Sequence, residues 1–186
     1  MNDPDTSSLL TFQDRFPVRE KKLDGPFSEE RICDIAHSAA EVLNAIIALE
    51  QLSFEAADPE AKGTSAELHR IEQKLDFVTE LLARVLQHQQ VIPESGTIRM
   101  SAERVWWQPK ESVQTTDHCL VEIYLSQKYP LPLELPVEVL NIHSERQGEA
   151  IAEGRILFTD ENLTDDLMRL VFLFHRREIA RNRSHR

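Results

Sequence analysis

Apolar residues recur with two different periods along the chain, and the change of period divides it into segments. Residues 8–20 read as extended chain, whereas residues 28–49 and 68–85 place apolar side chains alternately three and four positions apart. After Pro93, apolar and polar residues alternate every second position. The pattern predicts one strand, two helices, a run of short strands and a closing helix.

The two helical stretches are predicted to form an antiparallel hairpin. Ser28 is a suitable N-cap for the first helix, because two glutamates follow it in the first turn. Residues 55–63 contain a proline and a glycine that break the pattern, and residues 64–67, TSAE, form a capping box for the second helix. Helices of similar length joined by a short breaker fold back on each other.

Both helices carry more apolar surface than one hairpin requires. Such surface either covers the rest of the chain or packs on helices of other copies, since a large exposed apolar patch is unusual in a soluble monomer. We favour contact between copies. The predicted interface residues are Ile32, Ile35, Ala36, Ala39, Ala40, Val42, Leu43, Ile46, Ile47, Leu49, Leu68, Ile71, Leu75, Val78, Leu82 and Val85.

Four further strands are predicted over residues 97–107, 118–125, 131–142 and 149–159, separated by polar turns. With residues 8–20 they indicate an antiparallel sheet or a small barrel, and therefore an α+β fold.

A closing helix is expected to begin at Asn162 or Thr164. Its predicted packing face consists of Leu163, Leu167, Leu170, Val171 and Phe174. Trp106 and Trp107 are neighbours in a predicted strand, so their rings point to opposite faces of the sheet. We expect one ring in the core and the other packed over the outside, rather than stacked on a ligand.

Composition narrows the class of protein. The 186 residues and 41% hydrophobic content suit one domain, or a compact domain with an appended element. A net charge of −11 argues against binding nucleic acid or an anionic membrane. We expect no secretion signal and no membrane-spanning helix. The two cysteines do not have the close spacing of a CxxC motif. We therefore expect a cytoplasmic protein with two buried or half-buried free thiols.

The sequence offers no pattern for catalysis or for binding a metal. It lacks the GxSxG, Walker A, HExxH and GxGxxG motifs, and it has only five glycines. Its seven histidines stand singly, without metal-ligand spacing. We expect a protein that is not an enzyme and that uses no metal or cofactor.

Three short stretches and the heptad helices together resemble the PilZ domain family. The stretches are FQDRFP at 12–17, IRMSAERVWW at 98–107 and HRREIA at 175–180. The chain is most similar to the atypical branch, in which two long heptad helices are inserted into the barrel. The resemblance implies a six-stranded antiparallel β-barrel with a C-terminal helix. Residues 1–26 would contain the first strand, residues 27–91 the inserted hairpin for oligomerisation, and residues 92–186 the remainder.

The resemblance also implies a function. Typical PilZ domains are receptors for the bacterial second messenger cyclic di-GMP, and they control motility, pili, biofilm and virulence through other proteins. The helix-inserted branch implies a tetramer.

The two ligand-binding motifs of typical PilZ domains, RxxxR and [D/N]xSxxG, are only partly present. Arg15 and Arg19 have the spacing of the first motif. In the second, Ser101 is retained, but Arg99 replaces the acceptor and Arg104 replaces the glycine. A guanidinium cannot accept the N–H groups of guanine, and a long side chain occupies space where glycine allows close approach. We therefore expect residues 97–109 to be a barrel strand with a degenerate site.

Three functional hypotheses follow. The first is a non-enzymatic regulatory protein, a homo-oligomer and expected tetramer, that acts through unidentified protein partners in bacterial motility, pilus or virulence control, with weak or absent cyclic di-GMP binding. The second is a working receptor that uses Arg15 and Arg19. The third is an adaptor whose helical hairpin docks on an unrelated partner.

Overall fold

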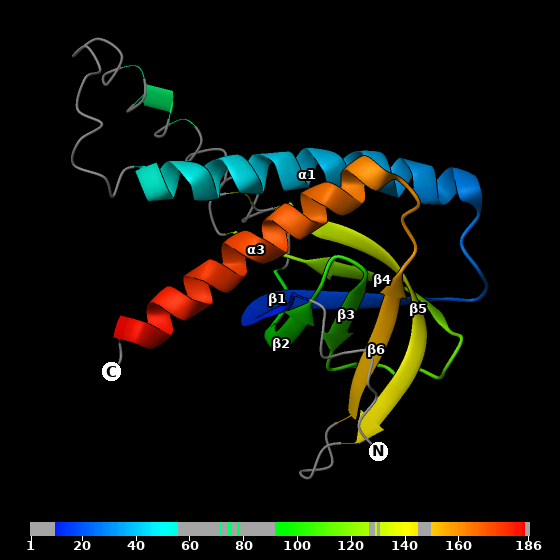
Figure 1. Ribbon diagram of the computed structural model, residues 1–186. Helices are drawn as coiled ribbons and strands as arrows, with labels where there is room; N and C mark the ends of the chain where they lie inside the picture. Colours follow the sequence, from blue (N-terminus) through cyan, green and yellow to red (C-terminus); the bar gives the residue numbers. More distant parts are fainter. Residues whose placement is uncertain are drawn as a thin grey trace.

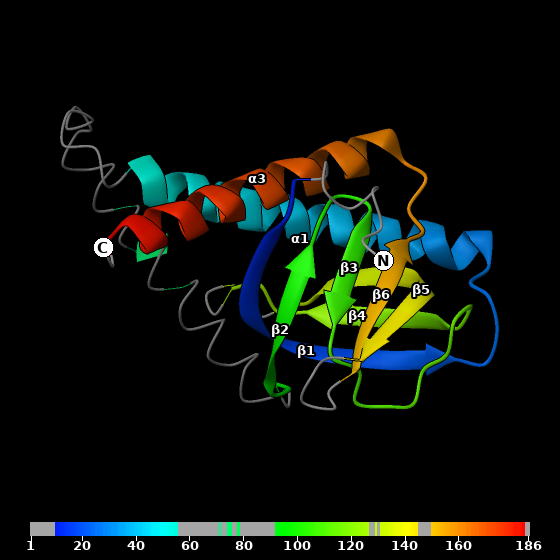
Figure 2. The same ribbon diagram turned by 60° about the horizontal axis from the view of Figure 1, so that its bottom comes forward.

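The computed structural model describes residues 10–55, 71, 74–75, 78, 92–126, 129, 131–144 and 150–184. The elements in chain order are β1 (Phe12–Leu23), α1 (Glu29–Glu55), β2 (Ser95–Met100), β3 (Arg104–Trp107), β4 (His118–Ile123), β5 (Leu133–Ser144), β6 (Ala150–Ile156) and α3 (Glu161–Ser184). The strands close into a barrel, and the two long helices lie together across one side of it (Figure 1, Figure 2).

All strand pairs are antiparallel, in the order β1-β2-β3-β6-β5-β4 around the barrel, which confirms the predicted architecture. β1 closes the barrel because its first half pairs with β2 and its second half pairs with β4. Pro17 is the last residue that pairs with β2, and the strand continues beyond it. β1 ends at Leu23, three residues beyond the extended segment predicted over residues 8–20.

The strand predicted over residues 97–107 is two strands. β2 and β3 form a hairpin, with Ile98 opposite Trp107 and Met100 opposite Val105, and residues 101–103 make the turn between them. The prediction of one strand was wrong because alternation continues on both sides of a short turn that contains no glycine or proline. This hairpin supplies the strand missing from the sequence-based count.

Aromatic and aliphatic side chains join the barrel to both helices. Phe12 and Phe16 of β1 contact Phe174 of α3, with ring centroids 5.0 and 5.6 Å apart. The predicted packing face of α3 is confirmed, since all five of its residues are buried. α3 begins one residue before Asn162, where the Asp160 carboxylate accepts a 2.9 Å hydrogen bond from the Asn162 backbone N–H.

α1 begins as predicted and buries its apolar face within the chain. The Ser28 hydroxyl accepts a hydrogen bond from the backbone N–H of Arg31 at 3.3 Å, as an N-cap does. α1 packs against both α3 and β5. The predicted interface residues on α1 that are buried here are Ile35, Ala39, Val42, Leu43, Ile46 and Ile47, and those that are half-buried are Ile32, Ala36, Ala40 and Leu49.

A side chain with no exposed surface can gain no burial from a second copy. The buried residues of α1 thus cover the rest of the chain, whereas contact between copies through the half-buried ones stays a prediction.

The second predicted helix is described at only a few residues. Ile71, Leu75 and Val78 are helical and are 55%, 61% and 50% exposed. The predicted interface residues Leu68, Leu82 and Val85 lie outside the described residues, as does the capping box at 64–67. These three residues have helical spacing, and at least half of each side chain is exposed.

Two smaller expectations need correction. The segment Glu29–Glu50 of α1 is long and apolar enough to cross a membrane by length and composition, with a mean hydropathy of 1.5, although no such run was expected. A core helix passes the same test, and the apolar face of α1 packs on the barrel. The two cysteines are free, but Cys33 is exposed and only Cys119 is buried. Burial raises the pKa of the Cys119 thiol to about 11.

Candidate functional site

The two arginines of the RxxxR motif lie four residues apart on the outer face of β1, because Phe16 and Val18 between them point into the core. The Arg15 side chain is exposed and donates a 3.2 Å hydrogen bond to the backbone oxygen of Ser95. The Arg19 guanidinium contacts the Glu122 carboxylate, with Nε and Nη2 at 2.7 and 2.6 Å from Oε2. Arg15, unlike Arg19, has no carboxylate partner among the described residues.

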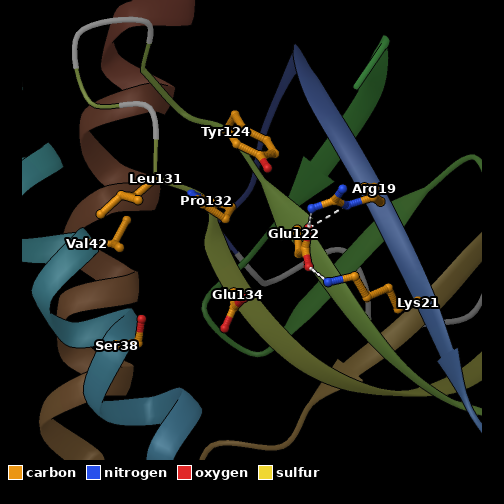
Figure 3. Close-up of a pocket in the computed structure, with 9 residues that line it drawn as sticks. All are labelled: Arg19, Lys21, Ser38, Val42, Glu122, Tyr124, Leu131, Pro132 and Glu134. Atoms are coloured by element: carbon orange, nitrogen blue, oxygen red, sulfur yellow. Dashed lines mark hydrogen bonds and ion pairs between the residues drawn. The ribbon is translucent and has the colours of Figure 1, made fainter. Parts of the chain in front are cut away.

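Glu122 is the centre of an ion cluster on the outer face of the barrel (Figure 3). Its carboxylate is buried, with 2% of the side chain exposed, and it also accepts a hydrogen bond from Lys21 Nζ. Arg19 and Lys21 are about half exposed. The hydrogen bond to Glu122 raises the pKa of Arg19 further above its ordinary value.

Glu134 lies directly opposite Glu122 on the neighbouring strand β5. Burial raises its pKa, and the negative charge of Glu122 raises it further. Glu134 makes no hydrogen bond or ion pair with another described residue. A half-buried carboxylate without an ion pair to another described residue therefore stands beside the ion cluster, where the charges of Lys21, Arg19 and Arg31 partly offset the rise of its pKa.

These side chains line a pocket of about 390 Å³ between the barrel and α1. Its lining residues belong to β1, α1, β4 and the residue after it, and β5 and the segment before it. They are Arg19, Lys21, Ser38, Val42, Glu122, Tyr124, Leu131, Pro132 and Glu134. Figure 3 shows Ser38 and Val42 on the helix side, facing the strand that carries Glu134. The pocket combines paired charges, hydroxyl groups and an apolar wall.

The serine of the second motif is used to build the β2–β3 turn. Ser101 is buried, and its Oγ accepts hydrogen bonds from the backbone N–H groups of Glu103 at 3.3 Å and Arg104 at 3.0 Å. Its own N–H donates to the Arg104 oxygen at 2.9 Å. Ser101 thus satisfies the backbone of a turn that has no glycine.

The two arginines that flank this turn are held by neighbouring strands. The Arg99 guanidinium lies 4.8 Å from the centre of the Trp106 ring, directly across the β2–β3 pair. Arg104 Nη1 donates a 2.8 Å hydrogen bond to Glu153 on β6. The expectation for the tryptophans is confirmed: Trp107 is in the core, and Trp106 packs outside under Arg99.

Glu153 receives a second contact, from His143 Nε2 at 3.3 Å. Burial alone would raise the pKa of Glu153, but the hydrogen bonds from Arg104 and His143 outweigh it and hold the pKa below its ordinary value. Arg104 is therefore tied to an ionised carboxylate.

The structure does not gather the five predicted ligand-binding residues into one cluster. Arg15 and Arg99 are diagonal neighbours on the outer face of β1 and β2, because Arg15 pairs with Thr97. Arg19, in contrast, lies beyond the point where β1 changes partner and faces β4. Ser101 is enclosed in its turn, and Arg104 points towards β6.

Sequence reasoning missed the carboxylates that organise this surface. Neither Glu122 nor Glu134 was among the candidate site residues. The signal that could have revealed them is the apolar character of the outer face of β4, where Leu120 and Tyr124 flank Glu122 and all three are buried. Glu20 was missed as well; it accepts a 2.5 Å hydrogen bond from the indole N–H of Trp107.

Comparison with models of known protein families identifies the family of this chain. A family model described as "Atypical PilZ domain, cyclic di-GMP receptor" matches residues 43–184. The chain belongs to the atypical PilZ domain family. Within the described residues of this PilZ chain, no three histidine, cysteine or acidic side chains form a group that could hold a metal ion.

The same fold is found in a solved structure from Xanthomonas campestris, a tetrameric PilZ domain protein described as self-assembled through an unusual helical bundle. It is 23% identical, covers 94% of this chain and 92% of its own, and has a TM-score of 0.77. At this identity the likeness shows the fold alone.

Two further structures match more weakly, and their TM-scores of 0.37 carry no argument. One is the Bacillus subtilis inhibitor of motility MotI/DgrA, which is 13% identical and matches over 47% of this chain and 43% of its own chain. The other is the PilZ domain of YcgR from Escherichia coli with cyclic di-GMP, which is 12% identical and matches over 52% of this chain and 83% of its own chain. No curated protein sequence matches the chain.

Proposed function

We propose that this PilZ chain is a non-enzymatic regulatory protein of the cytoplasm that binds cyclic di-GMP weakly or not at all through the typical motifs. It acts through protein contacts in the control of motility, pili or virulence. One observation carries the proposal: four of the five motif residues are held by side chains of neighbouring strands or by the β2–β3 turn, whereas Arg15 donates only to the backbone oxygen of Ser95. Arg19 pairs with Glu122, Arg104 with Glu153, Arg99 with Trp106, and Ser101 with its own turn.

Each of these contacts would compete with the ligand. To bind a phosphate fully, Arg19 would have to leave a carboxylate that is buried and would then lack one of its two cations. Leaving a buried charged group without its partners costs about 1–3 kcal/mol or more. Arg99 offers no acceptor for a guanine edge, so that contact is missing as well.

The family description favours a second candidate, a working cyclic di-GMP receptor. Arg15 and Arg99 are neighbours on one exposed face, and two arginines can attract a phosphate. We expect this attraction alone to be weak and sensitive to salt, because exposed charges are screened.

A variant in which the second ligand-binding motif is restored distinguishes the weak-binding regulator from the working cyclic di-GMP receptor. The variant Arg99→Asp with Arg104→Gly returns the acceptor and the glycine, and Glu153→Gln is added so that no carboxylate loses its cation. We expect calorimetry to show tighter cyclic di-GMP binding by this triple variant than by Glu153→Gln alone. Equal heats from the two proteins would contradict the assignment of these two replacements as the cause of weak binding.

We further propose that the chain forms a homotetramer through its helices. The proposal is supported by the exposed stripe Ile71, Leu75 and Val78 and by the described assembly of the Xanthomonas campestris neighbour. Leu75→Glu puts a charge in the centre of this stripe, which costs several kcal/mol if a partner covers it. Lys74→Glu is the matched control, because it changes the charge at the adjacent exposed residue.

Sedimentation measures the result. We expect the wild type and Lys74→Glu to sediment as tetramers at micromolar concentration, and Leu75→Glu to sediment as a smaller species with an unchanged far-ultraviolet circular dichroism spectrum. A monomeric wild type would contradict this proposal and would favour the adaptor hypothesis.

A further inference from the structure

The outer face of α3 carries a line of apolar side chains. Met168, Phe172 and Ile179 are 52%, 49% and 39% exposed, and the half-buried His175 lies between the last two. We call these four residues the α3 seam. They follow one another at intervals of four, three and four residues, which is the spacing by which two helices meet along a straight line. The α3 seam therefore has the form of a helix-packing surface.

The α3 seam lies on the opposite side of the helix from the residues that pack on the barrel. Leu167, Leu170 and Phe174 form part of the buried face. At 3.6 residues per turn, the seam residues lie about 140–200° around the helix from Leu170. Large apolar side chains gathered on an exposed face mark an interaction site. The α3 seam is therefore a candidate surface for a partner.

The charges of α3 are separated by sign along its length. The first six residues include the carboxylates of Glu161, Asp165 and Asp166, whereas residues 175–181 include three arginines and one glutamate. Glu161 and Asp165 are exposed and continue the line of the α3 seam at the same spacing. Arg176 flanks the other end of the seam, 5.7 Å from the centre of the Phe172 ring. One end of the seam is thus acidic and the other end is basic.

We propose that α3 pairs in antiparallel orientation with α3 of a second copy through the α3 seam. An antiparallel pair brings the acidic end of each helix beside the basic end of the other, whereas a parallel pair brings like charges together. Such a contact is two-fold symmetric, so every interaction occurs twice. The contact uses other residues than the tetramer contact proposed for the second helix, and it does not depend on that tetramer.

The spacing of the seam sets the register of the pair. When Met168 of one copy lies level with Phe172 of the other, Asp165 lies level with His175 and Glu161 lies level with Ile179. The thioether of Met168 then meets an aromatic ring, which is a favourable contact. Arg176 lies one residue from the level of Asp165 in the other copy, so the two can form an ion pair.

Arg169 lies beside the two-fold axis in this register. The axis passes level with residue 170, so the two Arg169 residues are separated along the helices by about 3 Å, and the two Arg176 residues by about 18 Å. The approach of two Arg169 side chains is offset within each copy, because Arg169 Nη1 lies 3.6 Å from the Asp166 carboxylate. Residues 169 and 176 lie on the same flank of the seam, so they form a matched pair of positions for cross-linking.

Cross-linking of the full chain tests the proposal. A single pair of helices buries less area than a stable interface needs, so the contact is best trapped covalently. Cys33→Ser removes the exposed thiol, and Cys119 is buried. In this background we expect bismaleimidoethane to link Arg169→Cys into dimers at least about tenfold faster than it links Arg176→Cys, because only residue 169 meets itself across the axis.

A charge exchange tests the antiparallel pairing of the ends. Asp165→Arg places a cation beside His175 and Arg176 of the second copy, so it should slow the cross-linking of Arg169→Cys about fivefold or more. Adding Arg176→Asp should restore the rate, because the two charges are then exchanged and opposite again. The melting temperature of each variant shows that it is folded.

Three results would overturn the proposal in folded variants. They are the absence of a dimer from Arg169→Cys, as expected if α3 binds a different protein; equal rates for Arg169→Cys and Arg176→Cys, as expected for parallel pairing or random collision; and a charge exchange that does not restore the rate. Sedimentation keeps the tetramer question separate. A tetramer whose Arg169→Cys variant does not cross-link would overturn this contact alone, and a monomeric wild type whose Arg169→Cys variant cross-links would support it.

Discussion

The ion cluster around Glu122 makes an asymmetric prediction about stability. The Glu122 side chain is 2% exposed, whereas Arg19 and Lys21 are 46% and 55% exposed. Removing both cations by Arg19→Ala with Lys21→Ala leaves a buried carboxylate without a cation, and we expect a loss of about 3 kcal/mol. Glu122→Gln instead leaves two cations that water can reach, and we expect a loss of about 1 kcal/mol. The order of these two losses, more than their size, tests the reasoning.

Urea denaturation at one fixed protein concentration measures both losses, because an oligomer's stability depends on concentration. Arg15→Ala is the control for removing a charge from the same face of β1, and it should change the free energy of unfolding by less than about 0.5 kcal/mol. If the double variant loses no more free energy of unfolding than Arg15→Ala does, the Glu122 carboxylate is not buried as described. If Glu122→Gln costs more than the double variant, the assignment of the cost to burial of the carboxylate is wrong.

Three further substitutions have definite expected outcomes. In Gly154→Ala the new methyl group would lie 3.0 Å from the Trp107 ring, so we expect a loss of about 1–3 kcal/mol in urea denaturation. Leu43→Glu buries a charge where the wild-type side chain is 0% exposed, so circular dichroism should show unfolding rather than dissociation alone. The pKa of Glu153 is lower in the folded protein than its ordinary value of 4.5, so its ionised carboxylate stabilises the fold at pH values above 4.5. This stabilisation is lost as the pH falls through the folded-state pKa. The advantage of the wild type over Glu153→Gln in melting temperature should therefore be largest near neutral pH and shrink below pH 4.5; an advantage that is constant with pH would refute this.

The sequence predicted the architecture because each element satisfies its local pattern. The Ser28 cap and the apolar face of α3 appear in the structure at the predicted residues. The β2–β3 hairpin was missed because Ser101, rather than a glycine, completes the turn through its side chain. A hydroxyl that replaces backbone flexibility leaves no turn signal in the composition of the segment.

The site was harder to predict, since it depends on contacts between residues distant in sequence. Arg15 and Arg19 share a motif, but β1 changes partner between them, and that change separates their surroundings. The pocket residues Ser38 and Glu134 come together only because α1 folds over the barrel. The burial of Leu43 followed the same contact, which the helical period alone could not distinguish from contact between copies.

The central claim is that the motif residues are committed to partners within the chain. A calorimetric titration of the unmodified protein with cyclic di-GMP at physiological salt, with the mass determined on the same sample, tests it most directly. The account predicts no binding tighter than about 10 μM. A sub-micromolar, stoichiometric isotherm that Arg15→Ala abolishes would contradict it and establish the receptor that uses Arg15 and Arg19.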